Sequence, residues 1–456
     1  MSLRSIMSHN GTLFTKTIMK TSYYNIVLQY SDYLILYNSL SNSIVCFTQE
    51  EFQEIKKLLE QLDDFKTIYP RLFKKMEEAG FIVGENVDEL DYIKLKNKLS
   101  TFEESRCHLT INPTLDCNLK CWYCSTEFKQ ALHQGAMKPE IIEAVKKHIE
   151  YLILSKRISH LHLDWFGGEP LLYFYEIIKP IATCALELCR NNQVKFTHHI
   201  TTNSTLMNED MMRDFNNLRL NSFQIPLDGN EKHHNSIKFN SDKSGTFAAI
   251  IKNLNSLPQI IPDAKITLRI NYDRKTLYGI EDIIPLIADD AKKHITVDFQ
   301  KVWQIVCEEN DYEQLKRIKK IFIDNGLNSG FWAYQPGIFN RCYSDKFHHY
   351  AINYDGKVFK CTAQDYGKDK VIGVIQENGL ISWNMERLSK LFAHSTFDNE
   401  KCLKCKSLPI CMGPCITKNY EARKYDRPIP CVFENAEFAL DSYIIEQAHK
   451  RGLIKQ

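Results

Sequence analysis

The chain has 456 residues, of which 44% are hydrophobic and 25% charged, and its formal net charge is +2. These values are ordinary for a globular protein of two or three domains, and the near-zero charge gives no electrostatic argument for a nucleic-acid or membrane partner. No apolar run is long enough to span a bilayer, and the start of the chain lacks the apolar core of a secretory signal. We therefore expect a cytoplasmic protein.

The N-terminal part of the chain predicts a disordered start followed by a small folded module. Residues 1–22 are basic and acid-free, which favours disorder, with an organelle transit peptide as the alternative. Residues 23–88 contain three strand patterns, two helical patterns and a further strand, which predict a winged-helix-like α+β module. Thr48 and Glu51 have the spacing of a capping box at the first helix. The charged residues 89–104 are predicted to be a linker.

Residues 105–310 alternate short strands with helices. Six strand patterns, of which the first is "CHLTIN" and the last "ITVDFQ", are mostly separated by segments of helical period. Such alternation predicts a parallel sheet with right-handed crossovers. Because six β/α units are fewer than the eight of a closed barrel, we predict an α/β fold built on an open, partial (β/α)6 barrel.

Ten of the 15 cysteines occur in spaced groups, which indicates metal ligands in a reducing compartment rather than a disulfide framework. The first group, Cys117, Cys121 and Cys124, follows the first predicted strand of the barrel, at the strand end where such folds gather their chemistry. A [4Fe–4S] cube normally takes four thiolates, so three leave one iron open to a substrate or cofactor. A zinc site with a distant fourth ligand is the alternative.

The next two predicted strands also end in residues suited to binding. The second strand ends in "FGGEP", where Gly167 and Gly168 allow a close approach of the backbone to a ligand, and Glu169 can accept hydrogen bonds from an ammonium group. The third strand leads to Asn203 and Ser204, which offer short polar groups and also suit a plain turn. We expect these strand ends to lie together with the first cysteine group.

The cysteine spacing, with the aromatic Tyr123 before the third cysteine, resembles the radical S-adenosylmethionine (SAM) superfamily. In that family SAM chelates the open iron, and the reduced cluster cleaves it to methionine and a 5′-deoxyadenosyl radical that abstracts hydrogen. The resemblance assigns residues 167–169 to the SAM amine, and Asn203 and Ser204 to its ribose. Arg269, on the fifth strand, suits the SAM carboxylate, with a structural ion pair as the alternative.

The segment "PLDGNEKHHN" after the fourth strand is similar to the family's S-[IL]-D-G-x4-H-D pattern, with three departures. Pro226 stands where Ser is usual, Asn235 where Asp is usual, and Lys238 where Arg is common. These departures weaken the resemblance at this strand end, so no cofactor contact is assigned there.

A second cysteine-rich region, residues 335–435, is predicted to be irregular and to precede a C-terminal helix in residues 436–456. The order and spacing of its cysteines resemble the SPASM domain, which holds auxiliary clusters in peptide-modifying radical SAM enzymes. The resemblance implies two auxiliary [4Fe–4S] clusters, one on Cys402, Cys405, Cys411 and Cys431, the other on Cys342, Cys361 and Cys415. The second has no fourth cysteine nearby; its remaining ligand is a substrate thiolate, a water or carboxylate, or a borrowed residue such as Cys307.

The arrangement as a whole resembles ribosomal-peptide maturases, in which a leader peptide adds as a strand to the sheet edge of a winged-helix-like module. The resemblance implies a radical SAM enzyme of oxidoreductase type that abstracts hydrogen from a ribosomally made peptide, forms a thioether or C–C crosslink, and draws electrons from a flavodoxin or ferredoxin. For the module, a simple packing role is the alternative. No catalytic acid or base is identified.

Two alternative functions remain open from the sequence. The first is an anaerobic sulfatase maturase that makes formylglycine; these enzymes commonly carry Asp directly after the Gly-x4-Cys cysteine, where this chain has Thr362, with Asp365 as the nearest acid. The second is a non-catalytic, zinc-binding cysteine-rich scaffold.

Overall fold

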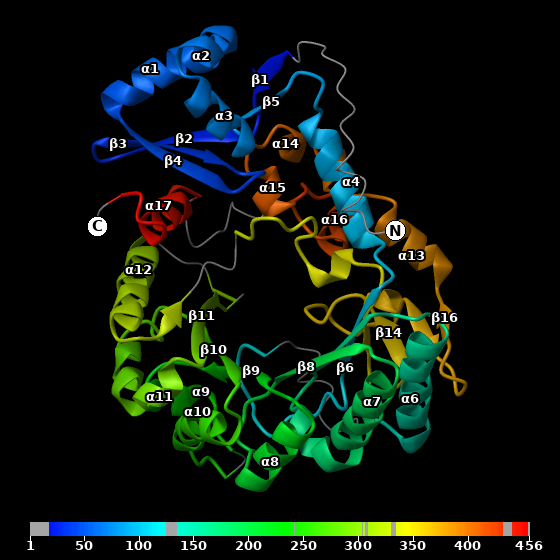
Figure 1. Ribbon diagram of the computed structural model, residues 1–456. Coiled ribbons are helices and arrows are strands. Elements are labelled where there is room, and N and C mark those ends of the chain that lie inside the picture. The colour runs from blue at the N-terminus through cyan, green and yellow to red at the C-terminus, as the bar shows by residue number, and fades with distance from the viewer. Residues whose placement is uncertain are drawn as a thin grey trace.

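The computed structural model describes residues 18–124, 135–240, 242–302, 304–305, 309–329, 334–431 and 440–454, so Cys307 lies outside the described residues. A strongly curved sheet runs through the molecule, with helices on its outer side and a smaller module at one end (Figure 1). Within the described part of the chain, no helix combines the length and apolar character that crossing a membrane requires.

The N-terminal module contains a three-stranded antiparallel sheet and three helices. Its elements are β1 (Met19–Thr21), β2 (Asn25–Tyr30), β3 (Tyr33–Asn38), β4 (Ser43–Thr48), α1 (Gln49–Glu60), α2 (Leu62–Ile68), α3 (Pro70–Glu78) and β5 (Ile82–Gly84). The sheet order is β2-β3-β4, and β1 pairs with β5. The predicted capping box is confirmed, because Glu51 N donates to the Thr48 hydroxyl and the Glu51 carboxylate accepts from Thr48 N.

Two predictions for this end of the chain need correction. Residues 19–21 form strand β1 because β5 offers a partner, so the predicted disorder of 1–22 is wrong for this part; residues 1–17 lie outside the described residues. The predicted linker 89–104 contains helix α4 (Glu89–Thr101), which Asp88 caps. The helix is charged, yet Ile93 is fully buried against the cysteine-rich region, which anchors it.

The predicted partial barrel is confirmed. Its six parallel strands are β6 (Arg106–Ile111), β7 (His160–Trp165), β8 (Lys195–Thr201), β9 (Ser222–Leu227), β10 (Lys265–Tyr272) and β11 (Ile295–Lys301), adjacent in chain order. The covering helices are α6 (Pro139–Leu154), α7 (Lys179–Asn191), α8 (Glu209–Asn217), α9 (Glu231–Ile237), α10 (Phe247–Ile260), α11 (Asp289–Lys292) and α12 (Glu309–Asp324). Within the described residues the sheet does not close into a barrel. β12 (Asn328–Ser329) extends it beyond β11, and strands of the cysteine-rich region extend it beyond β6.

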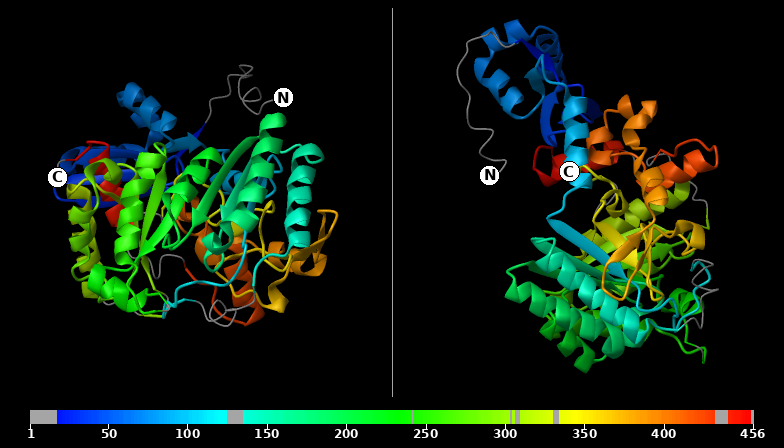
Figure 2. Two further views of the ribbon diagram at one scale, coloured as in Figure 1. Left: turned by 90° about the horizontal axis from the view of Figure 1, so that it is seen from below. Right: turned by 90° about the vertical axis from the view of Figure 1, so that its right-hand side faces the viewer.

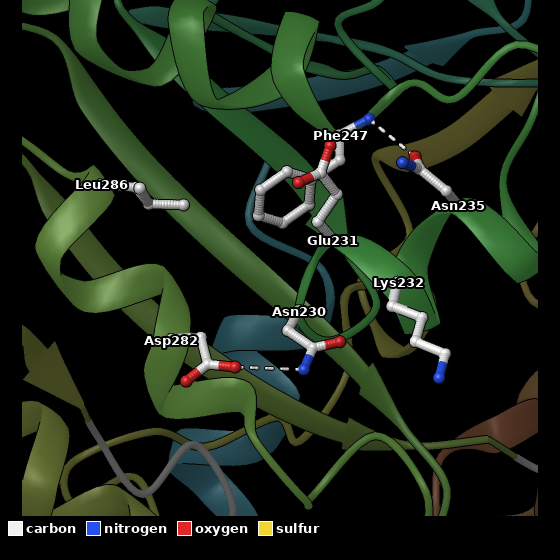
Figure 3. A pocket seen from close by; sticks show the side chains of 7 residues that line it. All are labelled: Asn230, Glu231, Lys232, Asn235, Phe247, Asp282 and Leu286. Carbon is white, nitrogen blue, oxygen red and sulfur yellow. Dashed lines mark hydrogen bonds between the residues drawn. The ribbon is translucent and has the colours of Figure 1, made fainter.

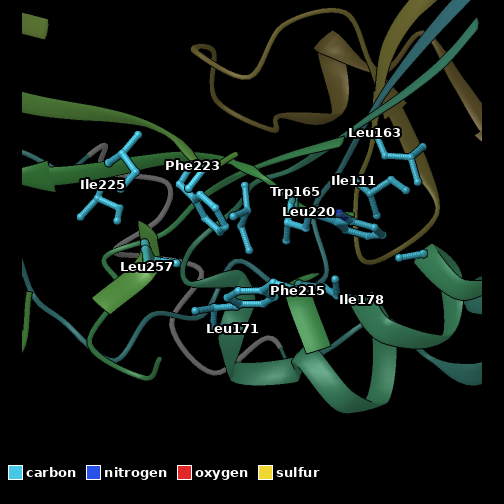
Figure 4. Packing of buried hydrophobic residues seen from close by; sticks show 14 of the residues in the cluster. Ile111, Leu163, Trp165, Leu171, Ile178, Phe215, Leu220, Phe223, Ile225 and Leu257 are labelled. Atoms are coloured by element: carbon cyan, nitrogen blue, oxygen red, sulfur yellow. The ribbon is translucent and has the colours of Figure 1, made fainter. Parts of the chain in front are cut away.

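Alternation along the barrel strands separates an apolar face from a polar one. Leu163, Trp165, Phe223 and Ile225 are fully buried and pack against the helices (Figure 4). The residues between them on β6, β7 and β10 are largely polar and line the face without helices. This polar inner face is the surface on which a ligand inside the barrel would rest.

The cysteine-rich region is more regular than predicted, because its strands continue the barrel sheet. β13 (His349–Ile352) pairs in parallel with β6, and β14 (Lys357–Phe359), β15 (Gly373–Ile375) and β16 (Ile381–Trp383) follow in antiparallel order. Its helices are α13 (Met385–Phe392), α14 (Glu400–Leu403), α15 (Leu408–Cys411) and α16 (Ile416–Lys424). The expected C-terminal helix is α17 (Leu440–Lys450), with Gly452 just beyond it at φ +66°.

The N-terminal module is docked on the cysteine-rich region and on α17 (Figure 2). Ile35 and Tyr37 of β3 pack against Tyr443 and Ile444 of α17, on the sheet face opposite to α1–α3. The Tyr23 hydroxyl donates to Lys404 O at 2.8 Å. The three-stranded sheet is therefore covered on both faces, while its two outer strands are not paired with another strand of the described structure.

Candidate functional site

The first cysteine group lies in the loop that follows β6. Burial, together with negative charge on the nearby Glu169, Cys121 and Cys124, raises the pKa of the Cys117 thiol to about 12. Every cysteine in the described ranges is a free thiol. Three clustered, unpaired thiols at a strand end are a donor set that suits an iron–sulfur cluster with one open iron.

The glycine segment after β7 packs directly on this cysteine loop. Gly168 N donates to Thr114 O at 3.1 Å, and Glu169 N donates to Asp116 O at 2.8 Å. A Cβ on Gly168 would lie 2.1 Å from Asp116 O, and one on Gly167, where φ is +121°, would lie 2.2 Å from Thr114 O. The contact between the two loops thus explains why both positions are glycine.

Glu169 is a buried carboxylate at the centre of the site. It accepts hydrogen bonds from Thr202 Oγ1 at 2.6 Å, Asn203 N at 2.7 Å and Leu171 N at 3.0 Å. Burial raises its pKa to about 7 despite these bonds. No lysine or arginine of the described chain forms an ion pair with it, so a ligand ammonium group would supply the missing positive charge.

Asn203 and Ser204 are held beside the cysteine loop. Asn203 Nδ2 donates to Asn118 Oδ1 at 2.9 Å and lies 3.9 Å from Cys117 Sγ. Ser204 has a left-handed φ of +60°, and its main-chain oxygen accepts from Asn253 Nδ2 at 2.7 Å. The Ser204 hydroxyl is buried and has no hydrogen-bond partner among the described residues.

Tyr123 joins a polar network that crosses the barrel. Its hydroxyl donates to Asp228 Oδ2 at 2.6 Å and accepts from Asn271 Nδ2 at 3.2 Å, and Arg269 Nε donates to Asn271 Oδ1 at 2.9 Å. Lys238 Nζ lies 2.9 Å from Asp228 Oδ2, and both side chains are almost completely buried. Arg269 is thus linked to the cysteine loop through Asn271.

The ion pair between Asp228 and Lys238 was not predicted from the sequence, although both residues lie at the fourth strand end considered there. Two charged residues near an apolar strand give no sequence signal of mutual contact, because their pairing depends on how α9 folds back over β9. The departure at Asn235 has a structural explanation: its Oδ1 accepts from Thr246 N at 2.9 Å and Phe247 N at 3.1 Å, at the start of α10.

A surface pocket lies outside the predicted site, near α9 (Figure 3). There, Asn230 Nδ2 donates to Asp282 Oδ2 at 3.2 Å. The pocket is lined by Asn230, Glu231, Lys232, Asn235, Phe247, Asp282 and Leu286. None of these is a cysteine or one of the predicted SAM contacts, so this pocket is not the candidate site.

The cysteines of the second region form two spatial groups. Cys342 and Cys415 interact strongly, which raises the pKa of Cys342 and lowers that of Cys415. Burial raises the pKa of Cys361, and the nearby Cys415 adds to this effect. In the other group, burial raises the pKa of Cys411 to about 12 and that of Cys402 to about 11, with further effects from neighbouring thiols. Cys405 and Cys431 contribute to the raised pKa of Cys402, and Cys402 and Cys405 contribute to that of Cys411, so these four thiols lie together.

Both the barrel and the cysteine-rich region match families of known proteins. Residues 111–284 match the radical SAM superfamily, and residues 342–406 match the SPASM iron–sulfur cluster-binding domain. The cysteine-type anaerobic sulfatase-maturating enzyme of Clostridium novyi is 23% identical over 338 residues, which cover 66% of this chain and 85% of that protein.

Two solved structures share the fold. One is native anSMEcpe with bound AdoMet, with a TM-score of 0.53 and 20% identity, covering 75% of this chain and 99% of the other. The other is Streptococcus suis SuiB bound to S-adenosylmethionine, with a TM-score of 0.50 and 15% identity, covering 90% of this chain and 98% of SuiB. At these identities the likeness concerns the fold alone.

The two family matches fall on the regions that hold the cysteine groups, and they define an iron–sulfur enzyme of the radical SAM type. The chain belongs to the radical SAM superfamily and carries a SPASM domain. Its first domain implies a [4Fe–4S] cluster with SAM, and its SPASM domain suggests further iron–sulfur clusters. The alternative of a non-catalytic zinc scaffold is therefore wrong.

Proposed function

We propose that this enzyme modifies a ribosomally made precursor peptide and forms a thioether or C–C crosslink in it. The observation that carries the proposal is the N-terminal module, a small sheet with unpaired outer strands docked on the cysteine-rich region. Such a sheet edge suits capture of an extended peptide through main-chain hydrogen bonds. Docking on the SPASM domain would hold the captured peptide near the barrel.

The residues around the first cysteine loop fit the cofactors that the family implies. Cys117, Cys121 and Cys124 would hold the cluster, and Glu169 would accept hydrogen bonds from the SAM amine, because its buried carboxylate has no cationic partner among the described residues. When bound and reduced, this cofactor pair supplies the radical that abstracts hydrogen. Tyr123 does not bind through its hydroxyl, which Asp228 already occupies, so its ring is the part available to a ligand.

The remaining contacts to SAM are assigned from the positions of three polar side chains. Asn203 and Ser204 would lie beside the ribose, as the family resemblance implies, because Asn203 is held next to the cysteine loop. Arg269 would pair with the SAM carboxylate through the guanidinium nitrogens that its bond to Asn271 leaves free. Gly167 and Gly168 act indirectly, since they let the Glu169 loop pack on the cysteine loop.

The SPASM domain is proposed to hold two auxiliary [4Fe–4S] clusters. The four-cysteine group would saturate one cluster, and the group of Cys342, Cys361 and Cys415 would leave one iron without a cysteine. Near the second group, the Tyr343 ring stacks on His349 at a centroid distance of 4.2 Å, and His349 lies 3.7 Å from His108 inside the barrel. These rings connect the barrel interior to the auxiliary site, through which an electron would leave the substrate. A flavodoxin or ferredoxin is proposed as the electron donor of the enzyme.

The outer strand β2 is the edge that we assign to the leader peptide. Tyr30 and Tyr33 flank a two-residue turn and form a hydrogen-bonded pair, so Val27, three residues back, directs its N–H away from β3. Val27 shares a sheet face with the buried Leu36, yet its side chain is 51% exposed, because α1–α3 do not reach over it. A peptide strand added there would cover this apolar side chain.

A second candidate function is supported by the similarity to the sulfatase-maturating enzyme of Clostridium novyi. Against it, Thr362 follows the Gly-x4-Cys cysteine, and its hydroxyl is bonded to the Tyr343 hydroxyl at 2.5 Å. The nearest acid, Asp365, is paired with Lys370, and its pKa is lowered although burial opposes this. The side chains of both residues are thus engaged by partners within the protein.

The peptide encoded beside this gene tests the function most directly. Co-expressed with the enzyme under anaerobic conditions, it is expected to lose the mass of two hydrogen atoms for each crosslink, as read by tandem mass spectrometry. Formylglycine made from serine has the same mass change, so an aldehyde-reactive hydroxylamine separates the two products. A peptide of unchanged mass contradicts the proposal for that partner, and an aldehyde product replaces it by the sulfatase-maturase function.

The role of β2 is tested in the same experiment with Val27→Pro. Proline removes the outward N–H but no ladder bond to β3, so modification is expected to fall by up to about tenfold, the effect of losing one main-chain hydrogen bond. Val27→Ala keeps the N–H and serves as the matched control. If V27P modifies the peptide as well as V27A does, β2 is not the docking edge.

A further inference from the structure

Three side chains converge on the inner face of the barrel, and none of them is among the residues proposed above as ligands of the clusters or of SAM. His108 of β6 and His162 of β7 are direct neighbours in the parallel register, and Asp164 is two residues further along the same face. One ligand atom from each of the three lies within 4.8 Å of the others. Their side chains keep exposed fractions of 31%, 26% and 25%, so a small ion can reach them.

The contacts in this group orient it around the Asp164 carboxylate. His108 Nε2 is hydrogen-bonded to Asp164 Oδ2, and His162 Nε2 lies 3.1 Å from Asp164 Oδ1. The opposite nitrogen of His162, Nδ1, is bonded to Thr197 Oγ1 at 2.7 Å. Metal-binding histidines usually have such a partner on the second ring nitrogen, because it fixes the orientation of the ring.

The chemistry of this set indicates which ion it would take. Two imidazoles and one carboxylate suit borderline divalent transition metals, whereas Mg²⁺ and Ca²⁺ prefer oxygen ligands alone. Three protein ligands leave at least one coordination position for water or a substrate group, as in catalytic zinc sites. The strand register fixes the three residues on neighbouring backbones, so little rearrangement is needed to replace the hydrogen bonds by metal bonds.

We propose that His108 Nε2, His162 Nε2 and Asp164 form a binding site for one divalent transition metal ion, of which Zn²⁺ or Mn²⁺ is representative. The site faces the interior of the barrel, from strands β6 and β7, and is separate from the three cysteine groups. An ion there would bring positive charge and a ligand position to the surface along which a substrate chain would lie. The proposal depends on the barrel alone and does not rest on the identity of the peptide.

The test uses Mn²⁺ as the probe and the cluster-loaded protein, in which the cysteines of the three groups bind iron and cannot bind Mn²⁺. Free Mn²⁺ is followed by its room-temperature electron paramagnetic resonance signal during titration. The wild-type protein is expected to bind about one Mn²⁺ per chain, displaced by Zn²⁺ in line with the Irving–Williams order. His162→Gln and Asp164→Asn are each expected to weaken this binding by more than about tenfold, because each removes a ligand.

His160→Gln is the matched control. His160 lies on the same strand and face as His162 and bonds Thr197 Oγ1 at 2.8 Å, but it is not one of the three ligands. H160Q is expected to bind Mn²⁺ as the wild type does, and an iron content equal to wild type shows that each variant is folded. The proposal is overturned if the wild type binds no Mn²⁺, if H162Q and D164N bind it unchanged, or if H160Q loses it equally.

Discussion

Replacing Cys117, Cys121 and Cys124 together with alanine is expected to remove about four irons per chain, the content of one [4Fe–4S] cube. The three thiols lie in one loop, are free in the structure, and are close enough to influence one another, as one cluster requires. The SPASM cysteines are untouched and are expected to keep their iron. The measurement is iron analysis after anaerobic reconstitution, together with the spectrum of the dithionite-reduced protein.

The matched control is a triple alanine variant of cysteines whose pKa is not influenced by any of the ten predicted cluster ligands. Cys46, Cys184 and Cys189 have this property, and burial is the largest cause of the raised pKa of each thiol. This control is expected to retain the full iron content, with at most some loss of stability at the fully buried Cys189. Equal iron in both triple variants would show that the loop after β6 does not hold a cluster.

Lys238→Met is expected to destabilise the barrel by about 3–5 kcal/mol, because it leaves Asp228 buried without its cation. The Lys238 and Asp228 side chains are 3% and 0% exposed, and the 2.9 Å ion pair joins helix α9 to the end of β9. Hydrogen–deuterium exchange in strands β9 and β10 is the measurement, with protection expected to fall roughly a hundredfold or more, since each 1.36 kcal/mol is a factor of ten.

Two further variants separate charge from shape at this position. Lys238→Arg keeps the cation and is expected to lose much less protection than K238M. Adding Asp228→Asn to K238M removes the uncompensated charge and is expected to restore most of the loss. If K238M exchanges like the wild type, or if D228N fails to rescue it, the ion pair does not stabilise this part of the barrel.

The six barrel strands could be predicted because their residues alternate between a buried and a polar face, a pattern that each strand carries within itself. The capping box of α1 was equally local. By contrast, β1 has three residues and depends on β5, more than sixty positions away, for its pairing. Helix α4 was expected as a linker because its charge obscures the single buried face that holds Ile93.

In the site, too, features set by nearby residues could be predicted, whereas contacts between distant segments could not. Cysteine spacing is local, and it was sufficient to predict which thiols the fold brings together. The grouping of His108 with His162 and Asp164 depends on the register of two strands separated by an intervening helix. The role of Gly168 likewise appears only when the two loops are seen in contact, because its partner atoms belong to Leu115 and Asp116.

The central claim is that the first cysteine loop holds a cluster that cleaves SAM. The direct measurement is 5′-deoxyadenosine, quantified by chromatography after the anaerobically reconstituted enzyme is mixed with SAM and dithionite. The account predicts that the wild type releases 5′-deoxyadenosine and methionine in equal amounts, and that the alanine variant of Cys117, Cys121 and Cys124 releases none. Release by the wild type that does not exceed that of this variant would contradict the account.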